Sequence, residues 1–163
     1  MTPQENQIIT AYQRTAPIDI TALATTLGLS VYESYNLPHG ISGKISWAGQ
    51  SESASGYSIS VNARDSYSRR RFTIAHECAH YLLHRSKIGD ELSDDGMYRS
   101  EKLTSQDEFD ANNLAADLLM PRHLVDQYVK QGHGGAASLA EIFKVSEPAM
   151  RVRLRYLYWQ DEI

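Results

Sequence analysis

Two histidines and a glutamate stand at metal-binding spacing in the segment His76-Glu77-Cys78-Ala79-His80. Residues four apart on an α-helix share one face and lie about 6 Å apart along its axis, so the rings of His76 and His80 can converge on one ion. Glu77 is turned by about 100° from His76, which lets its carboxylate stand beside the metal and accept a proton from a bound water. The pattern predicts a zinc site with Glu77 as the general base of peptide hydrolysis.

A simpler interpretation is a buried helix whose two histidines are satisfied by hydrogen bonds alone. The surrounding residues, among them Phe72, Ile74 and Leu82, make the helix strongly apolar. Burying two imidazole rings and a carboxylate in such a helix costs free energy, which binding to a metal ion would offset. We therefore favour the zinc site.

A third zinc ligand is expected from an acidic residue on a later helix, because catalytic zinc sites keep three protein ligands and one open position. The best source is residues 107–112 (DEFDAN), with Glu108 as the first choice and Asp110 as the second. The competing interpretation is a capping box over residues 105–108 (SQDE), in which Glu108 only bonds back to the start of its helix. Asn112, one turn after Glu108, either supports a ligand histidine or is solvated.

Other residues near the motif are expected to have structural roles. His84 lies about 12 Å along the helix from His76, too far to share a tetrahedral ion, and is expected to interact with the helix dipole. Cys78 points away from His76 and is expected to be buried. Of the arginines at 69–71, we expect one to pack against the protein and the others to be solvated. Peptide hydrolysis also needs a group that stabilises the oxyanion. Candidates for this role, by residue type alone, are Tyr98, Arg122 and His123.

The elements around the motif predict an α+β fold. Two short amphipathic helices come first, the second closed by Gly28, and three β-rich runs follow at 29–35, 41–47 and 56–62. We expect a small, mostly antiparallel sheet packed against the motif helix and further helices. Residues 85–104 are polar and predict a long surface loop. Helices are expected again from Ser105 to Pro121, beyond Pro121, and over 138–143 and 148–159.

The composition is that of a protein with one compact core. At 163 residues and 42% hydrophobic content, the chain can bury a sizeable apolar interior. No apolar run reaches the length of a membrane span, and the first ten residues lack the features of a signal peptide. A single cysteine excludes an intrachain disulfide. We expect a cytoplasmic protein without membrane association, and the oligomeric state stays open.

Several segments resemble the ImmA/IrrE-type metallopeptidases. They run in order over roughly residues 17–121: PIDITALATTLGLSVYE, GISGKI, YSISVN, RRRFTIAHECAHYLLH and DEFDANNLAADLLMP. The family usually has His-Glu-Leu-Gly-His where this chain has His-Glu-Cys-Ala-His, and often Glu-Ala-Asn where this chain has Asp110-Ala111-Asn112. In the first departure the residue before His80 is still small, and in the second Asp110 is still acidic. The resemblance implies a zincin-like fold, an acidic third ligand near Asn112, and cleavage of a partner helix-turn-helix repressor in stress responses or mobile elements.

The C-terminal segment offers a competing function. Residues 138–154 (SLAEIFKVSEPAMRVRL) resemble a helix-turn-helix with basic residues on its second helix. The alternative is therefore a DNA-binding or repressor-binding regulatory module with a non-catalytic zinc site. Direct nucleic-acid binding is not expected, because Glu141 and Glu147 would lie near the DNA and the net charge is −4. We expect residues 1–131 to form the zincin-like peptidase domain and residues 132–163 to pack on it as a helix-turn-helix-like segment.

Overall fold

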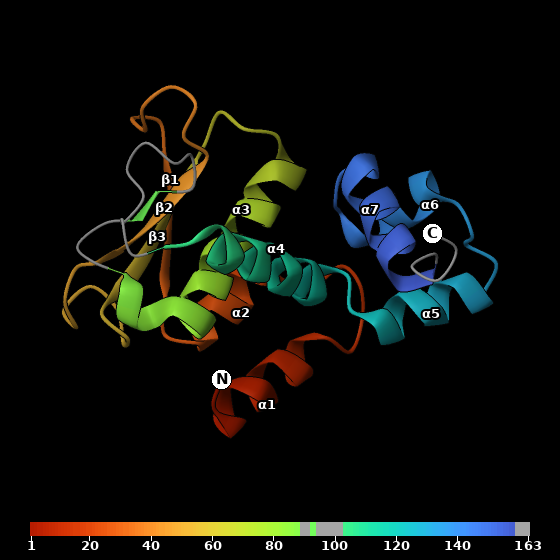
Figure 1. Cartoon of the computed structure of the whole chain (residues 1–163), viewed down its shortest axis with the longest axis horizontal. Helices are drawn as coiled ribbons and strands as arrows, with labels where there is room; N and C mark the ends of the chain where they lie inside the picture. Colours follow the sequence, from red (N-terminus) through yellow and green to blue (C-terminus); the bar gives the residue numbers. More distant parts are fainter. Residues whose placement is uncertain (89–91, 94–102, 159–163) are drawn as a thin grey trace.

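Seven helices and a small sheet make up the part of the chain that the structure, a computed structural model, describes: residues 1–88, 92–93 and 103–158. In Figure 1 the sheet lies at one end of the molecule, α5–α7 lie at the other, and α3 and α4 lie between them. The helices are α1 (Pro3–Tyr12), α2 (Ile20–Thr26), α3 (Tyr67–His84), α4 (Ser105–Leu119), α5 (Arg122–Lys130), α6 (Ala136–Phe143) and α7 (Glu147–Tyr158). Among the described residues, none of these helices has the length and apolarity that a membrane crossing needs.

The sheet has four strands in the order β1-β3-β2-β4. They are β1 (Ser30–Ser34), β2 (Gly43–Trp47), β3 (Tyr57–Asn62) and β4 (Leu92–Ser93). β2 pairs antiparallel with β3 and with β4, whereas β1 pairs parallel to β3. The α+β fold is confirmed, and its sheet is mostly antiparallel as expected, with one parallel edge.

Residues 85–104 differ in part from the expected loop. The 3-10 helix η1 (Arg85–Lys87) continues from α3, and β4 adds a short edge strand next to β2. The expectation of an unbroken loop was therefore wrong for these residues, because backbone pairing with β2 is available even to a polar segment. Residues 89–91 and 94–102, which include Tyr98, lie outside the described part of the chain.

α3 is held tightly against the sheet. Ser66 begins the helix by accepting a hydrogen bond at its Oγ from the backbone N–H of Arg69, at 3.3 Å. Gly43 on β2 faces the helix, and a Cβ added there would lie 2.4 Å from Thr73 Cγ2 and 2.9 Å from the Ser60 carbonyl oxygen. Only glycine lets strand and helix approach this closely. The helix that carries His76 and His80 is thus fixed in place along the sheet.

One hydrophobic core joins the sheet to the C-terminal helices. It includes Ile59 of β3 and Ala75 of α3 together with Phe143 of α6 and Met150 of α7, all of them fully buried. α6 ends at Lys144 in the left-handed conformation (φ 54°), and α7 follows after a short turn, as the sequence predicts. Segments on both sides of residue 131 contribute to this core, and their division into a domain and an appended segment stays a prediction.

Arg71 ties the turn between α6 and α7 to α3. Its side chain is buried, and its guanidinium donates to three backbone carbonyls: Nη1 to Ile18 at 2.7 Å, Nε to Lys144 at 3.0 Å and Nη2 to Phe143 at 3.2 Å. Its neighbour Arg70 instead forms a surface ion pair with Glu33. The expectation that one arginine of the cluster packs is confirmed.

Candidate metal centre

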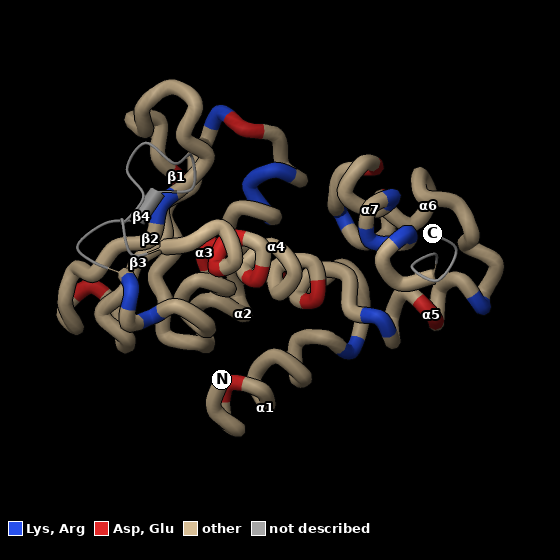
Figure 2. Tube along the Cα trace, viewed as in Figure 1, with Lys and Arg blue, Asp and Glu red and all other residues tan. Residues whose placement is uncertain are grey.

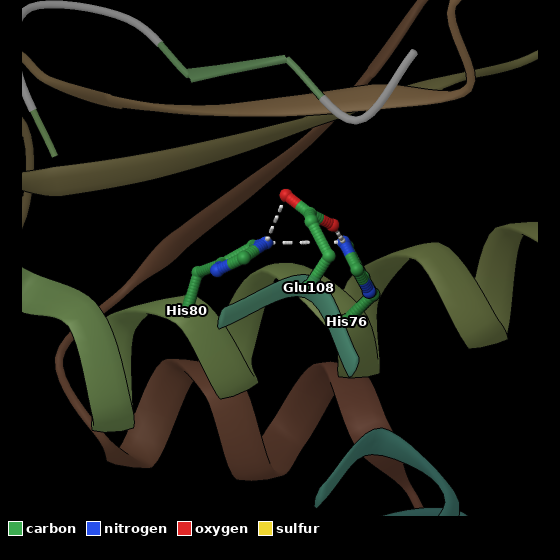
Figure 3. A group of neighbouring side chains, drawn as sticks. All are labelled: His76, His80 and Glu108. Carbon is green, nitrogen blue, oxygen red and sulfur yellow. Dashed lines mark hydrogen bonds and ion pairs between the residues drawn. The ribbon is translucent and has the colours of Figure 1, made fainter. Parts of the chain in front are cut away.

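Three side chains from two helices converge between α3 and α4. Figure 3 shows His76 and His80 projecting from α3 toward Glu108, which comes from α4. The two His Nε2 atoms are 3.1 Å apart, and each lies 3.4 Å from a different carboxylate oxygen of Glu108, His76 from Oε2 and His80 from Oε1. All three side chains are largely buried. The structure therefore brings together the two histidines and the acidic residue that the sequence places first.

These separations fit a tetrahedral zinc site. Ligand atoms about 2.0–2.2 Å from a tetrahedral zinc ion lie about 3.3–3.6 Å from one another, close to the separations of 3.1 and 3.4 Å found here. The donor set of two imidazole nitrogens and one carboxylate is also one that catalytic zinc sites use, with the fourth position left for water or substrate. Within the described residues, His76, His80 and Glu108 form the group of potential metal ligands whose donor atoms all lie within 4.8 Å of one another.

Glu108 is available to a metal because the helix cap lies one residue before Ser105, the cap of the competing interpretation. The N-cap of α4 is Thr104, not Ser105, and the capping box pairs Thr104 with Asp107. Thr104 Oγ1 accepts from the Asp107 backbone N–H at 3.1 Å, and Asp107 Oδ2 accepts from the Thr104 backbone N–H at 2.9 Å. The competing interpretation, a capping box over residues 105–108, is therefore wrong, because Thr104 caps the helix as Ser105 would. With Asp107 in the cap, Glu108 faces α3.

The other polar residues of α4 divide between the site and the surface. Asp110, the second choice for a ligand, accepts a hydrogen bond from Gln106 Nε2 at 2.8 Å on the exposed side. Asn112 Oδ1 lies 2.9 Å from His76 Nδ1, the nitrogen turned away from Glu108. Of the two interpretations left open for Asn112, the structure supports the one in which it orients His76.

His84 has neighbours that the sequence analysis did not anticipate. Its Nδ1 lies 3.0 Å from His80 Nδ1, and its Nε2 lies 3.3 Å from Asp107 Oδ1. Burial, and then the nearby His80, lower the pKa of His84. The expectation of a helix-end histidine that serves the dipole was incomplete, because Asp107 reaches His84 from α4, a tertiary contact. The only sign in the sequence was the repeat of histidine every fourth residue at 76, 80 and 84.

Electrostatics favour an ionised carboxylate at the centre. Burial raises the pKa of Glu108, but the facing rings of His76 and His80 more than offset this and leave the pKa well below its ordinary value. Glu77, next to His76 on α3, is completely buried. Cys78 is buried as expected, and burial, followed by the charge of Glu77, raises the pKa of its thiol. Cys78 is thus a core residue whose burial favours the neutral thiol over the thiolate.

A cavity of about 450 Å³ opens beside the converging side chains. Its wall joins α3 and α4 to the turn before α7, and it includes His76, Glu108, Asn112, Phe72, Val145 and Ala149. Two of the residues considered for the oxyanion bind backbone carbonyls elsewhere: Arg122 contacts Leu157 and His123 contacts Gln13. Neither lines this cavity.

Comparison with known families identifies the chain. The Peptidase_M78 family model, described as the IrrE N-terminal-like domain, matches residues 22–155, which include both helices of the metal centre. The chain belongs to this peptidase family. The resemblance seen in the sequence is thereby confirmed, and a metal-dependent peptidase family agrees with the convergence of two histidines and a glutamate.

One curated relative agrees with this family, and one solved structure agrees with the fold. The radiation response metalloprotease IrrE of Deinococcus deserti is 33% identical over 124 residues, which are 71% of this chain and 43% of that protein. A solved structure of a Mycobacterium tuberculosis transcriptional regulator matches 93% of this chain and 45% of its own, with a TM-score of 0.62 and 19% identity. At that identity the second likeness supports the fold alone. The chain thus spans less than half the length of both relatives.

Proposed function

We propose that this chain is a zinc-dependent endopeptidase of the cytoplasm that cleaves a partner helix-turn-helix transcriptional repressor. The observation that carries the proposal is the convergence of His76, His80 and Glu108 at separations that fit one tetrahedral zinc ion. Membership of a metallopeptidase family supports the same reaction. The repressor as substrate, and a role in stress responses or mobile elements, rest on the family resemblance.

Each residue has a distinct role in the proposed reaction. His76, His80 and Glu108 would hold the zinc, and a bound zinc ion would supply a Lewis acid that polarises a peptide carbonyl and lowers the pKa of a water molecule. Glu77 takes the proton from that water and then delivers it to the leaving amine. Asn112 accepts a hydrogen bond from His76 Nδ1–H and keeps His76 Nε2 directed at the metal.

The cavities beside the centre suit a peptide rather than a small polar molecule. The cavity that contains His76 and Glu108 shares Phe72, Asn112 and Ala149 with a second cavity of about 290 Å³ between α4 and α7. The second cavity has a mostly apolar wall that includes Met120 and Val152. Successive residues of an extended peptide advance by about 3.3 Å. A peptide bound across the metal can therefore place the apolar side chain of a nearby residue in the second cavity.

The alternative is a DNA-binding or repressor-binding module with a non-catalytic zinc site, and the specific feature in its favour is the α6–α7 pair. Figure 2 shows Lys and Arg positions along α7 and at the beginning of α3. Arg153 of α7, however, is buried, where it donates to the Met120 carbonyl and pairs with Asp117. Arg151 pairs with Glu147 on its own helix. Of these two arginines, Arg153 is thus engaged within the protein and Arg151 is paired on the helix surface.

The position of α7 also argues against DNA reading. In a helix-turn-helix the first residues of the second helix contact base edges. Here Val145, Ser146 and Ala149, from the turn and the first part of α7, line the cavity of the metal centre. We therefore assign this segment to the wall of the substrate cleft, packed on the peptidase domain of residues 1–131.

Replacement of Glu77 by glutamine tests the proposed reaction. The zinc-loaded wild type is incubated with a proteome-derived peptide mixture and with purified helix-turn-helix repressors, and new termini are read by mass spectrometry. We expect cleavage by the wild type, a loss of about 10²–10⁴-fold in Glu77→Gln, and equal zinc content in both proteins. Undiminished cleavage by Glu77→Gln would overturn the role of Glu77. Zinc binding without cleavage in the wild type would favour the binding module.

A further inference from the structure

We propose that His84 and Asp107 act as positioning residues for His80, holding its imidazole in the orientation and tautomer that bind zinc. We refer to them as the His84–Asp107 pair. The inference rests on the proposed zinc site, and it starts from the nitrogen that His80 turns away from that site. His80 Nε2 faces His76 and Glu108, whereas His80 Nδ1 lies 3.0 Å from His84 Nδ1.

The hydrogen-bond directions in this chain of contacts follow from zinc ligation. A neutral histidine that binds a metal through Nε2 carries its proton on Nδ1. His80 must therefore donate, and His84 must accept at Nδ1. A neutral His84 then carries its own proton on Nε2, which points at Asp107 Oδ1 at 3.3 Å. Each contact thus joins one donor to one acceptor.

The pair extends a familiar arrangement by one residue. A metal-binding histidine normally donates its second N–H directly to a carboxylate, a carbonyl or a water, which fixes the ring and raises its basicity. His76 follows that pattern with the amide oxygen of Asn112. On its Nδ1 side, His80 reaches the Asp107 carboxylate through a second imidazole, that of His84, and both His80 and His84 are buried. The ring centroids of His80 and His84 are 5.2 Å apart, so the two rings also support each other by packing.

Asp107 is itself held at a fixed position. Its Oδ2 accepts from Lys87 Nζ at 2.5 Å and from the Thr104 backbone N–H at 2.9 Å, which leaves Oδ1 directed at His84. Asp107 directly precedes Glu108 on α4. The first turn of α4 thus supplies one proposed zinc ligand, Glu108, and through Asp107 and His84 it also orients a second, His80. Both contacts require the same position of α4 along α3.

Zinc affinity, measured by competition with a chromophoric chelator, tests the pair without any substrate. His84→Phe keeps an aromatic ring but removes both nitrogens, and we expect it to weaken zinc binding by about 10–100-fold. His84→Gln offers an acceptor and a donor on one amide and should restore most of the affinity. Asp107→Ala should weaken binding, whereas Thr104→Ala, which removes a capping contact but keeps the carboxylate, should bind zinc as the wild type does.

Nitrogen NMR of histidine side chains supplies a readout that general destabilisation would not change. In the zinc-loaded wild type, His80 should carry a slowly exchanging proton on Nδ1, and His84 should be the Nε2–H tautomer. In His84→Phe the His80 Nδ1–H signal should lose its hydrogen-bonded shift. Unchanged zinc affinity in His84→Phe, or a proton on His84 Nδ1 in the zinc-loaded wild type, would overturn the proposal. A wild type that binds no zinc would instead overturn the proposed zinc site.

Discussion

Replacement of Arg71 by methionine should strongly destabilise the protein, because it removes the buried guanidinium that joins α3 to the turn between α6 and α7. The side chain is only 6% exposed and donates to the carbonyls of Ile18, Phe143 and Lys144. Each buried carbonyl left without a donor costs about 1–3 kcal/mol, so three of them at the lower end of that range cost about 3–5 kcal/mol. We expect the free energy of unfolding to fall by about 3–5 kcal/mol.

Arg70 provides a matched control on the adjacent position. It pairs with Glu33 at 2.8 Å, with the two side chains 25% and 60% exposed, and such surface pairs contribute about 0–1 kcal/mol. Arg70→Met should therefore change the stability by less than about 1 kcal/mol. Arg71→Lys, which keeps the charge but cannot reach all three carbonyls, should fall between the two methionine variants.

Urea unfolding of the metal-free protein, followed by circular dichroism, measures these differences. Zinc binding by folded Arg71→Met should match the wild type, because no zinc ligand is altered, while the cavity wall formed by Val145 and Ala149 should become more mobile. Equal losses of stability in Arg71→Met and Arg70→Met would refute the structural role assigned to Arg71.

Three further outcomes follow from the described contacts. Gly43→Ala should cost about 1–3 kcal/mol in thermal or urea unfolding, because the new Cβ would meet Thr73 Cγ2 at 2.4 Å, and Thr73→Ser in the same chain should recover part of the loss. Lys87, and then the Thr104 backbone N–H, lower the pKa of Asp107 from 3.8 to about 2. The ionised carboxylate therefore stabilises the fold above about pH 4, and this stabilisation is lost as the pH falls toward 2. The stability of metal-free Asp107→Asn should therefore depend less on pH in that window, and identical profiles would contradict the assignment. A thiol reagent at pH 8 should leave Cys78 unmodified until urea unfolds the protein, since burial raises the pKa of the thiol, and rapid reaction of the native protein would count against this.

Local spacing explains why the two histidines of the candidate site could be predicted. His76 and His80 are neighbours on any α-helix, and the apolar periodicity around them is enough to predict that helix. The strand segments and the turn between α6 and α7 were likewise visible in short-range patterns, because alternation and turn residues act locally.

Tertiary contacts explain what could not be predicted. Thr104 and Ser105 are both suitable N-caps, and only the packing of α4 against α3 decides that Asp107 closes the box while Glu108 turns to the histidines. The contact of His84 with Asp107 likewise joins separate helices. The parallel pairing of β1 with β3 depends on which strand reaches which edge, and the composition of short strands does not encode this.

Zinc analysis of the purified wild type beside His80→Ala and Glu108→Ala tests the proposed metal centre most directly. The wild type should hold about one zinc ion per chain after dialysis, as a site with three protein ligands does. Each variant should retain far less zinc while keeping its helical circular dichroism spectrum. Equal zinc content in all three proteins would contradict the assignment of His76, His80 and Glu108 as the metal centre.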